Sequence, residues 1–301
     1  MPSARSGPTI AQRLLCATLR EMRERAQMTP AEAAEKLGAA RTTVSRLEAA
    51  ETGPRPATVR RLLEIYSSRR INGRRVVTAA ERDQALRDLE AAQVPGWWHA
   101  YRDVLPPQIH GVLDLESAAE VIRIYAPGVV PDLLQCPDYA RALLRARAPR
   151  ESEEVIDRRL ELVLARQRHS IARTNPPPVR LWVLLEESAL HRPVGGPKVM
   201  RAQRSHLEEL IARRGPVTVQ VVPTAAGPHP MTSSGSIGLL RFHHPVLEDR
   251  LIVRGLRTEA TTDPELVGAA QAAMDLSAAL APPPTTPLPP LPDYLEARDE
   301  R

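Results

Sequence analysis

The sequence has 301 residues, which is enough for two domains, and its hydrophobic fraction of 43% can fill buried cores although aromatic residues make up only 3%. It has no apolar run of about 18 residues and no signal-like apolar stretch near its start, which predicts a cytoplasmic protein without a membrane-spanning helix. The formal charge is +5, and residues 1–75 alone carry 15 Arg and Lys against 7 Asp and Glu. A basic excess confined to one small region is typical of a domain that binds a polyanion such as nucleic acid.

The first two predicted elements are helices separated by a short polar break. Residues 9–26 place apolar side chains at helical spacing, with four arginines outside this stripe: Arg13, Arg20, Arg23 and Arg25. The second helix begins at Thr29, whose hydroxyl and the carboxylate of Glu32 form a capping box. Pro30 occupies the first helical position, where it loses no hydrogen bond, and Gly38 ends the helix.

A third predicted helix covers residues 41–49 and has one polar face. Two apolar side chains point inward, Val44 and Leu47. The opposite face carries four small or polar residues: Thr42, Ser45, Arg46 and Ala49. Such a face fits a helix that lies in a major groove, where Arg41 and Arg46 match guanine edges and Thr42 and Thr43 match a thymine methyl group or a phosphate.

A fourth helix over residues 57–67 follows the loop that contains Arg55 and completes a unit over residues 1–68. It buries four side chains: Val59, Leu62, Leu63 and Tyr66. Residues 69–80 are basic and contain Asn-Gly, so they are predicted to be a linker. Residues 81–281 form the larger unit, and the proline-rich residues 282–301 are predicted to be a disordered tail.

The stretch MTPAEAAEKLGAARTTVSRLEAAETGPRP resembles the phage-repressor-like (XRE) helix-turn-helix family. The resemblance implies that the partner is double-stranded DNA. The residues expected to contact it are Thr29, Arg41, Thr42, Thr43, Ser45, Arg46 and Arg55. Pro30 departs from the family, which usually has a phosphate-binding Gln there. Ala40 replaces the usual Ser and weakens the cap of the third helix by about 1 kcal/mol.

The second unit mixes helical and strand patterns, which predicts an α+β domain with a small mixed sheet. Helices are expected over residues 153–173, 198–213 and 264–280. Strands are expected near residues 179–185, 217–222, 236–242 and 250–254. The predicted fold class is therefore an α-helical N-terminal helix-turn-helix domain followed by an α+β C-terminal domain.

Most of residues 90–281 resemble the uncharacterised C-terminal domain that follows the same helix-turn-helix in many actinobacterial regulators, including those of the WhiJ type. The similar segments are Trp97-Trp98, Leu115-Glu116-Ser117-Ala118-Ala119, Val130-Pro131-Asp132-Leu133-Leu134-Gln135, Asp138-Tyr139-Ala140-Arg141-Ala142, Arg166-Gln167, Glu186 with Ala189-Leu190, and Val194-Gly195-Gly196. The resemblance implies a regulatory role, often with a small partner protein encoded nearby.

Catalytic and metal-binding patterns are lacking in the sequence, so no enzyme, metal or cofactor is expected. The eight histidines form no HExxH spacing, and His243 and His244 would face opposite ways on a strand. Cys16 and Cys136 are predicted to be buried thiols. Cys136 has no nearby histidine to activate it.

Three polar residues near the expected strand-to-helix connection are candidates for a ligand or partner site: Glu186, Arg192 and Gln203. They either line a polar pocket or belong to a solvated loop and helix surface. The leading hypothesis is a homodimeric, sequence-specific transcriptional regulator associated with the nucleoid. An alternative is an antitoxin-like interaction module that binds a small protein and regulates its own operon. A third reading is an enzyme that the helix-turn-helix localises.

Overall fold

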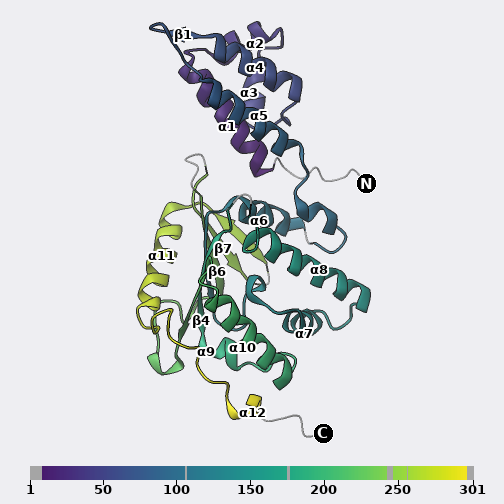
Figure 1. Cartoon of the computed structure of the whole chain (residues 1–301), viewed down its shortest axis with the longest axis vertical. Coiled ribbons are helices and arrows are strands. Elements are labelled where there is room, and N and C mark those ends of the chain that lie inside the picture. The colour runs from purple at the N-terminus through teal and green to yellow at the C-terminus, as the bar shows by residue number, and fades with distance from the viewer. Residues whose placement is uncertain (1–8, 106, 175–176, 243–246, 256, 297–301) are drawn as a thin grey trace. The chain divides into compact units, whose positions relative to one another are not determined.

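The computed structural model describes residues 9–105, 107–174, 177–242, 247–255 and 257–296 (Figure 1). The chain divides into two compact units, Met1–His99 and Ala100–Arg301. Within the described residues, no helix combines the length and the apolar character needed to cross a bilayer.

The first unit contains the four helices that the sequence predicts. They are α1 (Ile10–Arg25), α2 (Pro30–Leu37), α3 (Thr42–Glu48) and α4 (Pro56–Ser68). Their inward side chains share one core, which includes Leu15, Leu19, Ala33, Ala34, Val44, Leu47, Leu62 and Leu63. Each fully buried leucine contributes about 1.5–3 kcal/mol, so this core holds the short helices in place.

Residues 69–80 are not the linker that the sequence predicts. They form a hairpin of β1 (Arg70–Ile71) and β2 (Arg74–Arg75), and the start of α5 (Ala79–Gln93). The hairpin turn is tight because both turn residues, Asn72 and Gly73, adopt positive φ. Helix α5 packs against α1 and α4 and buries Ala85, Leu89 and Ala92 in the same core. The first unit therefore extends beyond the predicted limit at residue 68.

The second unit is built on a mixed six-stranded sheet with the order β5-β4-β3-β6-β7-β8. The strands are β3 (Val121–Ala126), β4 (Arg180–Glu186), β5 (Val217–Val222), β6 (Ser236–Arg241), β7 (Arg250–Arg254) and β8 (Thr258–Thr261). Strands β3, β4 and β5 are parallel, whereas β6, β7 and β8 pair antiparallel to their neighbours. The α+β class and the mixed sheet are therefore confirmed.

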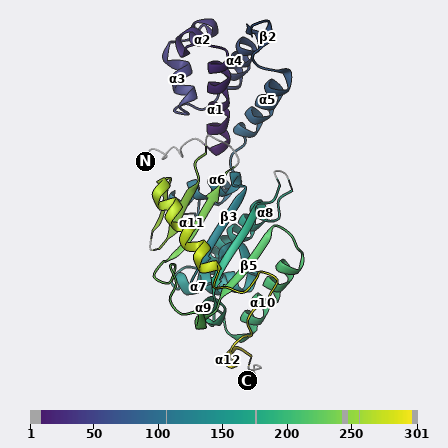
Figure 2. The same ribbon diagram turned by 90° about the vertical axis from the view of Figure 1, so that its left-hand side faces the viewer.

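Helices cover both faces of this sheet (Figures 1 and 2). One face packs against α11 (Pro264–Ala278) around Tyr125, Leu184 and Met274. The remaining long helices of this unit lie on the side of the other face (Figure 2), and they are α6 (Pro107–Ala118), α7 (Pro137–Arg147), α8 (Glu153–Ser170) and α10 (Pro197–Ala212). Of these, α10 contacts β5 and α6 contacts β8, while α7 packs against α8 and α10. Short helical segments complete the unit: α9 (Glu187–His191), α12 (Asp293–Glu296), and 3-10 turns at Asp132–Leu134 and Thr224–Ala226. A further 3-10 turn, Trp97–Tyr101, spans the division between the units.

The described part of the proline-rich tail is packed rather than disordered. Leu288, Leu291 and Leu295 are buried. The guanidinium of Arg204 donates to the carbonyl oxygens of Leu288 and Pro289, and Tyr294 donates to that of His191. Three leucines interleaved with the prolines give the tail an apolar side, which explains why it docks. The tail's last residues, 297–301, lie outside the described residues.

Candidate functional site

Both ends of α2 have the geometry that the sequence predicts. The backbone N–H of Glu32 donates to the Thr29 hydroxyl at 3.2 Å, and the N–H of Thr29 donates to the Glu32 carboxylate at 2.7 Å. Gly38 ends α2 in the left-handed conformation, with φ of 69°. Thr29 is therefore confirmed as the cap of α2, while its contact with DNA stays a prediction.

The face of α3 opposite its buried side chains is open to solvent. Arg41, Thr42, Ser45 and Arg46 are exposed and Thr43 is half-buried, while Val44 and Leu47 are buried. The cap residue of α3 is Arg41, one position later than the predicted Ala40, and its side chain makes no capping hydrogen bond. The exposed Arg55 directly precedes α4. The reading surface predicted on α3 is thus physically available.

Arg46 already has one ionic contact within the unit. Its Nε lies 3.3 Å from Oε2 of Glu51, and both side chains are more than half exposed. An exposed pair of this kind contributes about 0–1 kcal/mol. The guanidinium can therefore leave Glu51 for a phosphate or a base edge at little cost.

A buried ion pair holds α3 against α1, and the sequence pattern missed it. Arg23, which was predicted to lie outside the apolar stripe, donates from Nε and Nη2 to the two oxygens of Glu48 at 2.8 and 2.9 Å. Its Nη1 donates to the carbonyl oxygen of Met28 at 2.6 Å. The side chains of Arg23 and Glu48 are only 8% and 6% exposed. The two residues are 25 positions apart in sequence, so helical spacing gives no signal for this contact.

The arginine-rich hairpin does not belong to the α3 surface. It carries exposed Arg70, Arg74 and Arg75, which account for part of the basic excess of this unit. In Figure 2 the hairpin and α3 lie on opposite sides of the unit, with α1 and α4 between them. The positive charge of the N-terminal region is therefore spread over more than the predicted reading face.

In the second unit, the three residues predicted as a ligand or partner site do not surround one cavity. Gln203 is buried, accepts from the backbone N–H of Cys136 at 2.8 Å and donates to the Leu134 carbonyl at 2.7 Å. The Glu186 carboxylate accepts from the Tyr125 hydroxyl at 2.8 Å, on the sheet face that packs against α11. Arg192 alone of the three lines a large cavity.

Glu186 also belongs to a row of side chains that has the order of a hydrolase triad. Nε2 of His229 lies 2.9 Å from Oε1 of Glu186, and Nδ1 of His229 lies 2.9 Å from the Ser277 hydroxyl. Ser277 is fully buried, however, and its hydroxyl donates to the Ala273 carbonyl one turn earlier in α11. Because no substrate can reach that oxygen in this conformation, the row supports packing of α11 rather than nucleophilic attack.

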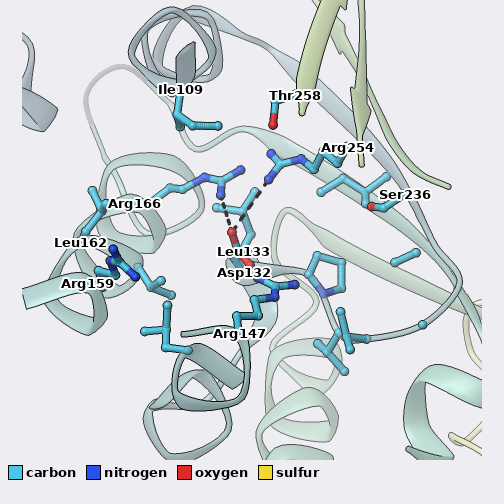
Figure 3. Close-up of a pocket in the computed structure, with 18 of the residues that line it drawn as sticks. Ile109, Asp132, Leu133, Arg147, Arg159, Leu162, Arg166, Ser236, Arg254 and Thr258 are labelled. Carbon is cyan, nitrogen blue, oxygen red and sulfur yellow. Dashed lines mark hydrogen bonds and ion pairs between the residues drawn. The ribbon is translucent and has the colours of Figure 1, made fainter. Parts of the chain in front are cut away.

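The large cavity, of about 840 Å³, lies entirely within the second unit (Figure 3). Its described lining has five arginines and one aspartate: Arg147, Arg159, Arg166, Arg192, Arg254 and Asp132. The guanidinium groups of Arg147, Arg166 and Arg254 converge on Asp132. Isolated positions in the sequence do not predict this cluster, because its members come from four separate segments.

All three nitrogen atoms of the Arg166 guanidinium donate hydrogen bonds to carboxylates. Its Nε and Nη2 donate to the buried Glu116 at 2.7 and 2.5 Å, and its Nη1 donates to Asp132 at 2.8 Å. Burial alone would lower the pKa of Arg166, but Glu116 and Asp132 raise it. Burial would likewise raise the pKa of Asp132, but Arg166, Arg254 and Arg147 together lower it. Asp132 is therefore a carboxylate held ionised by several cations.

Both thiols are buried, as predicted. Burial, reinforced by the charge of Glu48, raises the pKa of Cys16 to about 11, so this thiol stays protonated at neutral pH. Among the described residues, His, Cys, Asp and Glu form no group of three that could hold a metal ion. His243 and His244 lie outside the described residues.

Comparison with known families finds two matches, which together cover most of both units. A model of a helix-turn-helix domain matches residues 14–70. A model described as a domain of unknown function (DUF5753) matches residues 109–287, more than half of the chain. Neither the curated proteins nor the solved structures gave a match.

Proposed function

Because the chain belongs to the family defined by the domain of unknown function DUF5753 and carries a helix-turn-helix domain before it, we propose that it is a sequence-specific transcriptional regulator. The exposed polar face of α3, fixed in position by the buried Arg23–Glu48 pair, is the main support. The helix-turn-helix family points to a DNA-binding protein rather than to an enzyme. We also propose that the protein is cytoplasmic and associated with the nucleoid. Its helix-turn-helix is proposed to belong to the phage-repressor-like class.

Arg46 is proposed to read a guanine, with Arg41, Thr42, Thr43 and Ser45 beside it. The backbone around Thr29 and the side chain of Arg55 would contact phosphates, since both residues are exposed next to a helix start. A bidentate contact between arginine and guanine discriminates against the wrong base by about 1–3 kcal/mol.

The test begins with selection of a binding sequence from a random duplex pool by the full-length chain. Arg46→Ala should then weaken binding to that sequence by about 1–3 kcal/mol and change binding to unrelated DNA of the same length very little. Arg87→Ala, an exposed arginine on α5, is the matched control and should change neither. If no sequence is enriched, specific reading is refuted. An equal loss on both DNAs reassigns Arg46 to a phosphate.

We further propose that the regulator acts as a homodimer, with two recognition helices about 34 Å apart on successive half-sites. Two exposed leucines on α11, Leu266 and Leu276, and the exposed Leu280 just after it support a protein contact through the second unit. Sedimentation of the purified chain tests this, and Leu276→Ser should shift it toward the monomer. A monomeric wild-type chain that instead purifies from native cells with a stoichiometric small protein would favour the antitoxin-like alternative.

A further inference from the structure

The cavity of the second unit lies at a characteristic point of the sheet. Ile124 and Ala126, at the carboxyl end of β3, form part of its wall, and Ser236 at the start of β6 forms another. Strand β3 has the parallel strand β4 on one side and the antiparallel strand β6 on the other. Open sheets with covering helices tend to bind ligands beyond the carboxyl ends of strands, where the strand order reverses.

The walls of the cavity are of two kinds. One wall is apolar and comes from α6 and α8, with Ile109, Leu113, Leu162 and Val163 among its residues. The other wall carries the arginine cluster around Asp132 (Figure 3). A volume of about 840 Å³ matches that of sites for drug-sized ligands, which are mostly apolar with a few polar groups that orient the ligand.

The positive charges of the cavity are not balanced by the carboxylates beside them. Arg254 shares both Glu116 and Asp132 with Arg166, at 3.1 Å from Oε1 of Glu116 and 3.8 Å from Oδ2 of Asp132. Burial and the neighbouring Arg166 lower the pKa of Arg254. In the part of the chain that the structure describes, Arg147 makes no ion pair with a carboxylate, although it lies close enough to Asp132 to lower the pKa of that group. An additional anion would therefore relieve repulsion among these guanidinium groups.

We propose that this cavity binds a small organic anion that has an apolar body. Arg147 and Arg254 hold the anionic group, and the wall from α6 and α8 receives the body. Arginine suits this role because its planar guanidinium binds carboxylate, sulfonate or phosphate oxygens through paired hydrogen bonds. Binding follows from the cavity alone, whereas its use as a signal to DNA rests on the proposed function.

The experiment uses two fluorescent probes with the same ring systems, titrated with the full-length chain in the absence of DNA. 1-Anilinonaphthalene-8-sulfonate carries a sulfonate, and N-phenyl-1-naphthylamine does not. We expect one site, with the sulfonate bound at least tenfold more tightly. Arg147→Gln should weaken the sulfonate probe at least fivefold and leave the neutral probe within twofold.

Two further variants separate a site in the cavity from general surface effects. Arg168→Gln removes an exposed arginine of α8 that does not line the cavity, and it should leave both affinities unchanged. Leu162→Trp should fill the apolar wall and weaken both probes. Equal affinities for the two probes, or equal losses in Arg147→Gln and Arg168→Gln, would overturn the proposal. Because these titrations contain no DNA, their failure leaves the DNA-binding proposal to its own test.

Discussion

In the N-terminal unit, one buried arginine meets one buried carboxylate, and the Met28 carbonyl takes a third hydrogen bond from Arg23. In the C-terminal unit, Arg166 and Arg254 share Glu116 and Asp132, and Arg147 adds a further cation beside Asp132. In the first arrangement the cation does not outnumber the carboxylates, because Arg23 also lies 3.4 Å from the half-exposed Glu24. The second has more cations than carboxylates and faces a cavity.

This difference separates a structural ion pair from a candidate binding site. The opposite charges of a buried ion pair cancel most of each other's electrostatic field, so little remains to attract a ligand. The effect of the Arg23–Glu48 pair is therefore to fix the position of α3 relative to α1. An unbalanced cluster beside a cavity keeps a positive potential where an anion can enter. Removing one charge from either arrangement should therefore change stability in the first and ligand binding in the second.

The largest effect is expected from Glu48→Gln in the N-terminal unit. The substitution removes the buried counter-charge of Arg23 and leaves only the half-exposed Glu24, whose Oε1 lies 3.4 Å from Nη2 of Arg23. Breaking a buried ion pair in this way typically costs about 3–5 kcal/mol of unfolding free energy. Urea unfolding of the full-length chain, followed by circular dichroism and by hydrogen exchange of the amides in α1 and α3, measures the loss.

The matched control is Glu64→Gln, which breaks the exposed pair between Arg61 and Glu64. That change should cost less than about 1 kcal/mol. Replacing both buried partners, as in Arg23→Leu with Glu48→Leu, should recover most of the stability, because no unpaired charge then remains. If Glu48→Gln costs no more than Glu64→Gln, the pair does not hold α3 in place.

Much of the fold follows from local sequence. The capping box at Thr29, the left-handed Gly38 and the spacing of the apolar residues depend on neighbours a few positions away, so the first four helices were predictable. The linker prediction is wrong because the Asn72-Gly73 turn signal belongs to a β-hairpin and not to an irregular connection between domains. Strand β3 was not predicted either, although its alternating burial between Val121 and Ile124 is a strand pattern.

The sites depended on contacts that local patterns do not encode. Glu186 and Gln203 were predicted near a ligand, yet Tyr125 and His229 occupy the carboxylate of the first, and backbone groups occupy the amide of the second. Asp132 and Arg254 are 122 positions apart and meet only because β7 ends beside the loop that follows β3. Sequence alone could name the residue types but could not bring them together.

A smaller effect on stability is expected from Asp132→Asn in the C-terminal unit. Glu116 still holds Arg166 in this variant, and the Asp132 side chain is 26% exposed, so the loss should be about 1–2 kcal/mol. Binding should respond in the opposite direction: the sulfonate probe should bind several-fold more tightly because the cavity becomes more positive. Urea unfolding and the same titration measure both quantities. Weaker sulfonate binding would mean that Asp132 organises the site rather than opposing the anion.

The smallest effect concerns Glu81, which joins α5 to α1 in the N-terminal unit. Hydrogen bonds from Arg25 and from the Thr78 backbone lower the pKa of Glu81 from an ordinary 4.5 to about 2. A lowered pKa in the folded state gives stability that is fully present above pH 4.5 and is lost as the pH falls toward 2. Because the side chain is 35% exposed, we expect a contribution of about 1 kcal/mol. Urea unfolding from pH 7 down to pH 3 should show a shallower decline in Glu81→Gln than in the wild type or in the exposed control Glu90→Gln. Equal slopes in the three chains would mean that this half-exposed pair, unlike Arg23–Glu48, leaves the docking of α5 to its apolar side chains.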